Sequence, residues 1–122
     1  MRWTWSRCAM HEMALAEGVL QIVQDAARRE GAHRVRAVWL EIGRLSSVEP
    51  EAMRFCFAAV TRESVAEGAR LEIVETPGTA WCMRCSAAAA IEAVGDACPR
   101  CGSYQLQLTG GTEMRVKELE VD

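Results

Sequence analysis

The stretch GTAWCMRCSAAAAIEAVGDACPRCG, residues 78–102, decides how this chain folds, because it contains two cysteine pairs but few residues that could build a core. Two residues separate Cys82 from Cys85 and Cys98 from Cys101, and twelve residues separate the two pairs. This spacing lets two turns present four thiolates to one tetrahedral zinc ion. Zinc binding would also supply folding free energy that this alanine-rich segment cannot gain by burial. We therefore predict a zinc-ribbon-like domain with a closed, structural four-cysteine site.

Three other uses of these cysteines are open on sequence grounds, namely two disulfides, a redox pair formed by Cys82 and Cys85, or simple packing. A reducing compartment disfavours disulfides. A thioredoxin-type motif is normally single and stands at the start of a helix that follows a strand. Iron also suits four thiolates. The doubled motif favours structural zinc over these alternatives.

The sequence on both sides of residues 78–111 has the patterns of a small α+β domain. From Met13 onward, apolar residues recur at helical spacing, and the expected inward face of this helix is Met13, Ala16, Leu20, Val23 and Ala27. Residues 35–42 alternate as a strand does. Ser46, Ser47, Glu49 and Pro50 are typical of a helix start, and this second helix is expected to run to about Glu63. Residues 71–74 and 112–122 have strand character.

The order of these elements predicts an insertion, because a strand follows the cysteine segment as well as preceding it. We expect two helices and a short mixed sheet in a domain formed by residues 10–77 and 112–122. The zinc-binding domain, residues 78–111, is expected to interrupt it. The fold class is thus α+β with an inserted zinc-ribbon-like domain.

Composition and charge exclude several classes of protein. In 122 residues, Leu, Ile, Val and Phe supply only 25 side chains, so the core is thin and a metal staple is expected. The longest apolar run has six residues, well short of the roughly 20 of a membrane helix. The formal net charge is −3 with acids and bases interspersed, which gives no basic face for nucleic acid. Residues 1–9 lack the pattern of a secretory signal. We expect a cytoplasmic protein with no membrane or nucleic-acid partner.

Several motifs occur in order along the chain, and together they resemble the HypA/HybF family of hydrogenase nickel-incorporation proteins. The resemblance covers residues 10–122. It rests on the paired cysteines and on Met10-His11-Glu12-Met13, Leu40-Glu41-Ile42-Gly43-Arg44-Leu45-Ser46, Val48-Glu49-Pro50-Glu51, Thr109-Gly110-Gly111 and Arg115-Val116-Lys117-Glu118-Leu119.

The resemblance implies a metallochaperone rather than an enzyme. It implies that Ni(II) is carried to the active site of a [NiFe] hydrogenase, and that the partners are a maturation GTPase and the hydrogenase large subunit. The nickel site would be at Met10, His11 and Glu12, and the structural zinc would be bound by Cys82, Cys85, Cys98 and Cys101. The oligomeric state is left open, and a homodimer is one option. The alternative function is a regulatory or nucleic-acid-binding zinc ribbon.

The Met-His-Glu sequence has a chemistry of its own that suits nickel if Met10 begins the chain. The Met10 amine, the deprotonated His11 amide and the His11 imidazole would form fused chelate rings at three corners of a square, a geometry that selects Ni(II) or Cu(II). The Glu12 amide, the Glu12 carboxylate or a donor from a partner could fill the fourth corner. Nine residues precede Met10, carry a charge of +2 and contain no acid. We therefore expect the native chain to start at Met10.

Overall fold

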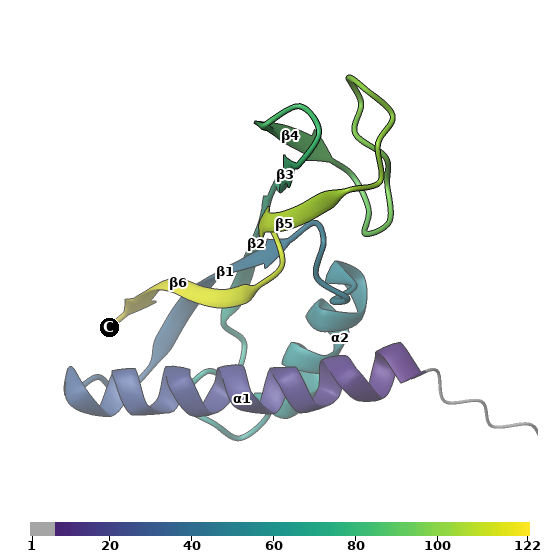
Figure 1. Ribbon diagram of the computed structural model, residues 1–122. Coiled ribbons are helices and arrows are strands. Elements are labelled where there is room, and N and C mark those ends of the chain that lie inside the picture. The colour runs from purple at the N-terminus through teal and green to yellow at the C-terminus, as the bar shows by residue number, and fades with distance from the viewer. Residues whose placement is uncertain (1–6) are drawn as a thin grey trace, which may run out of the picture. The chain divides into compact units, whose positions relative to one another are not determined.

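The computed structural model describes the backbone of residues 7–122 and the side chains from His11 onward. The predicted leader, residues 1–9, lies mostly outside this part, as does the side chain of Met10. The elements in chain order are α1 (Arg7–Arg29), β1 (Val35–Gly43), α2 (Pro50–Val60), β2 (Arg70–Thr76), β3 (Gly78–Cys82), β4 (Ala87–Ile91), β5 (Leu106–Gly110) and β6 (Met114–Val121) (Figure 1). The predicted α+β class is confirmed.

Helix α1 packs against α2, and its buried face differs in part from the predicted one. Ala16, Val23 and Ala27 are buried as expected, but Val19 is buried in place of Leu20, which is half-buried together with Met13. This expectation was wrong because α1 carries apolar residues on more than one face. The partner that it packs against therefore decides its rotation.

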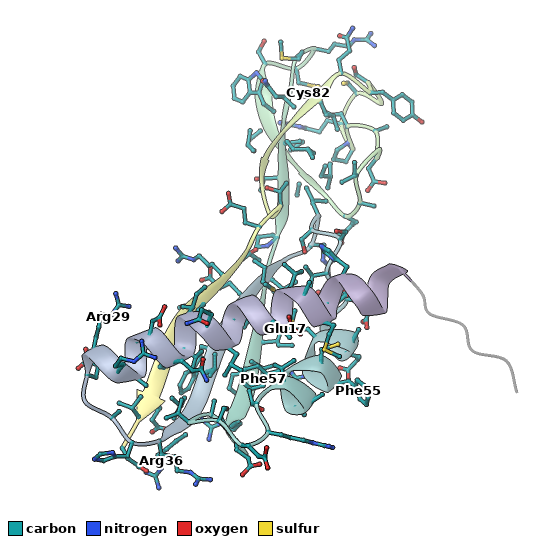
Figure 2. All side chains as sticks on the ribbon, turned by 90° about the horizontal axis from the view of Figure 1, so that it is seen from below. Glu17, Arg29, Arg36, Phe55, Phe57 and Cys82 are labelled. Atoms are coloured by element: carbon teal, nitrogen blue, oxygen red, sulfur yellow. The ribbon has the colours of Figure 1, made fainter. Side chains whose placement is uncertain are left out.

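Helix α2 begins where its sequence predicts, but its cap is Glu49 rather than a serine hydroxyl. The Glu49 carboxylate accepts hydrogen bonds from the N–H groups of Glu51 and Ala52, and Pro50 occupies the first turn. These contacts satisfy backbone donors that the helix leaves unpaired. The helix ends at Val60 rather than near Glu63, because Thr61 caps it and Glu63 adopts a positive φ of 59°. Phe57 is buried on the inward face whereas Phe55 is 73 % exposed, and Figure 2 labels both.

The first sheet has the strand order β2-β1-β6 and is mixed, as predicted. Arg44, just after β1, donates its N–H to the carbonyl of Thr76 at the end of β2, so β1 and β2 run parallel. At one end of β6 the Gly43 N–H bonds to Glu113, and at the other the Asp122 N–H bonds to Arg34. Strand β6 is therefore antiparallel to β1.

The second sheet has the strand order β4-β3-β5, and both neighbours are antiparallel to β3. Ala80 pairs with Ala89 on one side and with Leu108 on the other. The sheet has its own small core of Leu45, Ala80 and Ile91, against which Leu106 packs. A short alanine-rich sheet of this kind buries little apolar area, so it needs a further source of stability.

The chain divides into two compact units. The first comprises the chain up to Leu40, Val48–Ile73 and Val116–Asp122, and the second comprises Glu41–Ser47 and Val74–Arg115. The predicted boundaries at residues 78 and 111 stay a prediction. Within residues 7–122, no helix combines the length and the apolar content that crossing a membrane requires.

Candidate metal centres

The structure brings the four cysteines of the doubled motif together. Their sulfur atoms all lie within 4.8 Å of one another, with 3.6 Å between Cys82 and Cys101 and 3.9 Å between Cys85 and Cys98. Four sulfurs placed about 2.3 Å from a central zinc ion would be about 3.8 Å apart at the corners of a regular tetrahedron. The donor set therefore fits a tetrahedral thiolate-bound ion such as zinc.

Two similar turns position these sulfurs. In the first, Cys85 donates its N–H to Cys82 Sγ at 3.3 Å, and Ser86 closes the turn by donating to the Cys82 carbonyl. In the second, Gly102 donates to the Cys98 carbonyl at 2.8 Å. Ser86 and Gly102 both adopt left-handed backbone, with φ of 52° and 74°. Each turn therefore ends with the same change of direction, which glycine makes without strain and serine does not.

Backbone N–H groups and neighbouring thiols set the protonation of this cluster. Hydrogen bonds from the backbone N–H groups of Cys101 and Arg100 lower the pKa of Cys98 to about 6. Hydrogen bonding to the thiols of Cys101 and Cys82 raises the pKa of Cys85 to about 12. At neutral pH the metal-free cluster therefore contains one thiolate, Cys98, that can bind a metal ion directly. It also contains at least one thiol, Cys85, whose proton an incoming metal ion must displace.

The surroundings of the sulfurs are those of a closed site. Cys82 and Cys98 are buried, Cys85 and Cys101 are half-buried, and Ala89 and Leu106 pack against the cluster. Four protein ligands leave no open coordination position for a substrate or a catalytic water. This arrangement can hold the two turns and the β4-β3-β5 sheet together, which is a structural role.

The predicted nickel residues belong to α1, where they have contrasting environments. His11 is exposed, whereas Glu12 is completely buried. Glu12 Oε2 accepts a hydrogen bond of 2.6 Å from the Glu49 N–H at the start of α2. Among the described residues, Glu12 Oε1 has no hydrogen-bond partner. The structure thus leaves the His11 imidazole accessible to a metal ion and encloses the carboxylate beside it.

Sequence reasoning placed Glu49 among the acids at the start of a helix but missed both its role as the cap and its contact with Glu12. The two residues are 37 positions apart, so no local spacing links them. Both belong to motifs that carry the family resemblance, Met-His-Glu and Val-Glu-Pro-Glu. Their joint occurrence was the only signal that could have suggested a shared site.

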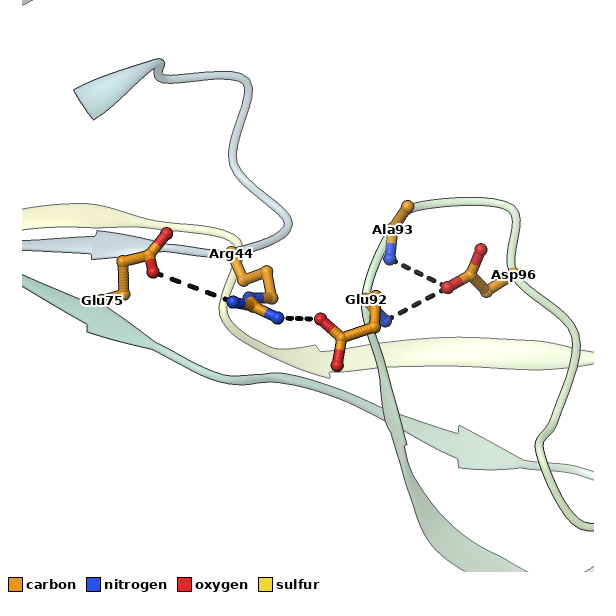
Figure 3. Close-up of polar contacts among 5 residues, drawn as sticks. All are labelled: Arg44, Glu75, Glu92, Ala93 and Asp96. Carbon is orange, nitrogen blue, oxygen red and sulfur yellow. Dashed lines mark hydrogen bonds and ion pairs between the residues drawn. The ribbon is translucent and has the colours of Figure 1, made fainter. Parts of the chain in front are cut away.

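A further cluster joins the loop after β1 to the β4-β3-β5 sheet. Arg44 pairs with Glu75 at 3.8 Å and with Glu92, and Asp96 accepts from the N–H groups of Glu92 and Ala93 (Figure 3). Arg44, Glu75 and Glu92 also line a cavity of about 250 Å³. Each acid here is paired or caps a turn, so the cluster is suited to fastening the loop rather than to binding a ligand.

Comparison with known proteins identifies relatives along almost the whole chain. A family profile described as "Hydrogenase/urease nickel incorporation, metallochaperone, hypA" matches residues 10–121. Proteins named hydrogenase maturation factor HypA from Albidiferax ferrireducens and Dechloromonas aromatica are 67% and 64% identical to this chain. Each match spans 113 residues, which is 93% of this chain and 100% of the relative.

The fold also matches solved structures. The solution structure of the Ni metallochaperone HypA from Helicobacter pylori superposes with a TM-score of 0.66 at 27% identity, covering 90% of this chain and 96% of that one. A second solution structure of a HypA protein has the same TM-score at 28% identity, covering 92% and 96%.

Proposed function

Because the chain belongs to the HypA family of hydrogenase and urease nickel-incorporation metallochaperones, we propose that it binds Ni(II) and delivers it to the active site of a [NiFe] hydrogenase. The exposed imidazole of His11, within a Met-His-Glu sequence at the start of the family match, is the observation that carries this proposal. An exposed site near a chain end can bind a metal ion and release it to a partner more readily than an enclosed one.

The proposed nickel site is formed by Met10, His11 and Glu12. Its ligands would be the Met10 amine, the His11 amide and the His11 imidazole, with the fourth donor supplied by Glu12 or by a partner. Imidazole and backbone nitrogens arranged in a plane favour Ni(II) or Cu(II) over Zn(II), which prefers a tetrahedron. The Met10 amine would be one ligand in a chain that starts at this residue. The family match begins at this same residue.

The proposed resident metal is zinc, bound by Cys82, Cys85, Cys98 and Cys101. The tetrahedral fit of the four sulfurs and their enclosure support this assignment. Zinc would supply the stability that the β4-β3-β5 sheet cannot gain from its small core. The two metals would then have separate roles, one structural and one carried.

The proposed partners are a hydrogenase-maturation GTPase and the hydrogenase large subunit, in the cytoplasm. The names of the curated relatives support a place in hydrogenase maturation. We assign no catalytic residue to the chain, because the proposed work is to carry and transfer an ion. Its specificity would come from the geometry of its nickel ligands and from its partners.

The test is nickel titration of the His11→Ala variant. We expect nickel binding to be lost while one zinc ion per chain is retained, as measured by elemental analysis. His33→Ala is the matched control, because His33 is the second of the two histidines in the sequence and should not affect nickel affinity. Unchanged nickel affinity in His11→Ala would reject the proposed site.

A further inference from the structure

The carboxylate of Glu12 has an environment that exposed metal ligands do not have. Its side chain is completely buried, and Oε2 accepts the Glu49 N–H at 2.6 Å. Burying a carboxylate is costly unless hydrogen bonds and opposite charge compensate it. A residue kept in such a place on the inward face of α1, where Ala16 and Val19 follow it, contributes something that an apolar residue would not.

The start of α2 supplies the compensation. Glu49 is the N-cap of this helix, and the positive end of the helix dipole favours an anion at this point. The Glu49 carboxylate accepts from the N–H groups of Glu51 and Ala52, and the Glu49 N–H donates to Glu12. The contact therefore links the first turns of α1 to the beginning of α2 by one charge-assisted hydrogen bond, a strong class of hydrogen bond.

This contact also fixes the backbone next to His11. Since residues 11 and 12 are consecutive, a buried and hydrogen-bonded Glu12 side chain restricts where the His11 backbone and imidazole can lie. An ordered Glu12 side chain leaves fewer torsions to be ordered when a metal ion binds at His11, which lowers the entropic cost of binding. Groups that orient metal ligands from outside the coordination sphere commonly contribute to metal affinity.

We propose that Glu12 is a positioning residue for nickel: its carboxylate binds the N-terminus of α2, holds His11 in place and stays off the metal. This inference rests on the proposed function and specifies the role of Glu12 in nickel binding. Burial, and after it the nearby Glu12 carboxylate, raises the pKa of the Cys56 thiol on the buried face of α2. Moving the carboxylate outward to reach a metal ion would break the bond to Glu49 and leave the N–H at the start of α2 without its charged acceptor.

The experiment compares Glu12→Ala with Glu12→Gln in the 122-residue chain and in the chain that begins at Met10. Ni(II) affinity is measured by competition with a chelator, and the ligand set is followed by the visible absorption band of bound Ni(II). Thr61→Ala is the structural control, because Thr61 is buried and its hydroxyl bonds to Phe57 at the far end of α2. It should lower stability without affecting nickel.

We expect Glu12→Ala to weaken nickel binding by about tenfold or more while leaving the absorption band unchanged. Glu12→Gln keeps an oxygen that can accept from Glu49, so its loss should be smaller, again with the same band. A shifted band in Glu12→Gln would overturn the proposal by making the carboxylate a ligand. Full nickel affinity in Glu12→Ala would also overturn it. Nickel binding that survives His11→Ala would instead reject the proposed function.

Discussion

The side chain of Leu45 lies directly over Gly78: a Cβ atom added at residue 78 would be 2.6 Å from Leu45 Cγ and 2.5 Å from the carbonyl oxygen of Ile91. Gly43 is packed as closely against Gly111, with no room for a Cβ. Leu45 belongs to the core of the β4-β3-β5 sheet together with Ala80. The loop after β1 and the start of β3 therefore fit together only because glycine occupies these positions.

Replacing Gly78 by alanine should destabilise the second unit. The added methyl group has no space, and overpacking of this kind costs about 1–3 kcal/mol. Chemical denaturation followed by circular dichroism would measure the free energy of unfolding. Gly18→Ala is the matched control, since nothing lies within 4 Å of a Cβ there and the residue is in α1. That change should stabilise the protein by about 0.5–1 kcal/mol. Equal effects of the two changes would contradict the packing argument.

Removing one zinc ligand should unfold the second unit while the first stays folded. In Cys98→Ser we expect loss of bound zinc and disordered amide signals for the residues of β3, β4 and β5, because metal binding supplies the folding free energy there. Elemental analysis and two-dimensional NMR would report both changes. Cys56→Ala should keep its zinc, since Cys56 is buried in α2. A zinc-free Cys98→Ser variant with native amide signals would exclude a structural role.

Zinc affinity should fall as the pH is lowered. The pKa of Cys98 is lowered to about 6, so this residue is a thiolate at neutral pH and takes up a proton only below that value. The pKa of Cys85 is raised to about 12, so zinc must displace its proton throughout the usual range. Protons therefore compete with zinc at every pH, and more strongly below about 6. Chelator competition across a pH series would measure this, and a pH-independent affinity would contradict it.

The chain that begins at Met10 should bind nickel more tightly than the 122-residue chain. With α1 starting at Arg7, the His11 and Glu12 N–H groups fall in a helical turn, where they bond to carbonyls four residues earlier. A helix that starts at Met10 leaves its first four N–H groups free. Displacing one such bond costs about 1 kcal/mol, and the Met10 amine is an added ligand, so we expect at least about a tenfold difference. Isothermal titration of both forms would measure it. Equal affinities would argue against the amine as a ligand.

Local sequence was enough to predict the two helices, the strands of the β2-β1-β6 sheet and the cysteine cluster, but not the strands β3, β4 and β5. The strand at residues 35–42 and the start of α2 at Pro50 followed from alternation and capping, which depend on near neighbours only. Each cysteine pair presents its two sulfurs together because two residues between cysteines let one turn do so, and the four sulfurs lie within 4.8 Å of one another. Hydrophobic periodicity and turn geometry depend on residues only a few positions apart. Short stretches of sequence are therefore enough to predict the structure that they produce.

Tertiary structure decided the contacts between distant residues. The rotation of α1, which buries Val19 rather than Leu20, depends on the surface of α2. The burial of Glu12 depends on a backbone N–H that lies 37 residues away, and the need for glycine at residue 78 depends on where Leu45 packs. Such contacts form only when the whole chain has folded. Each depends on how two elements pack, and the sequence of one element does not show which element lies against it. The sequence by itself determined which chemistry the chain carries. Only the folded structure decided that the Glu12 carboxylate is enclosed while the His11 imidazole is open to an incoming ion.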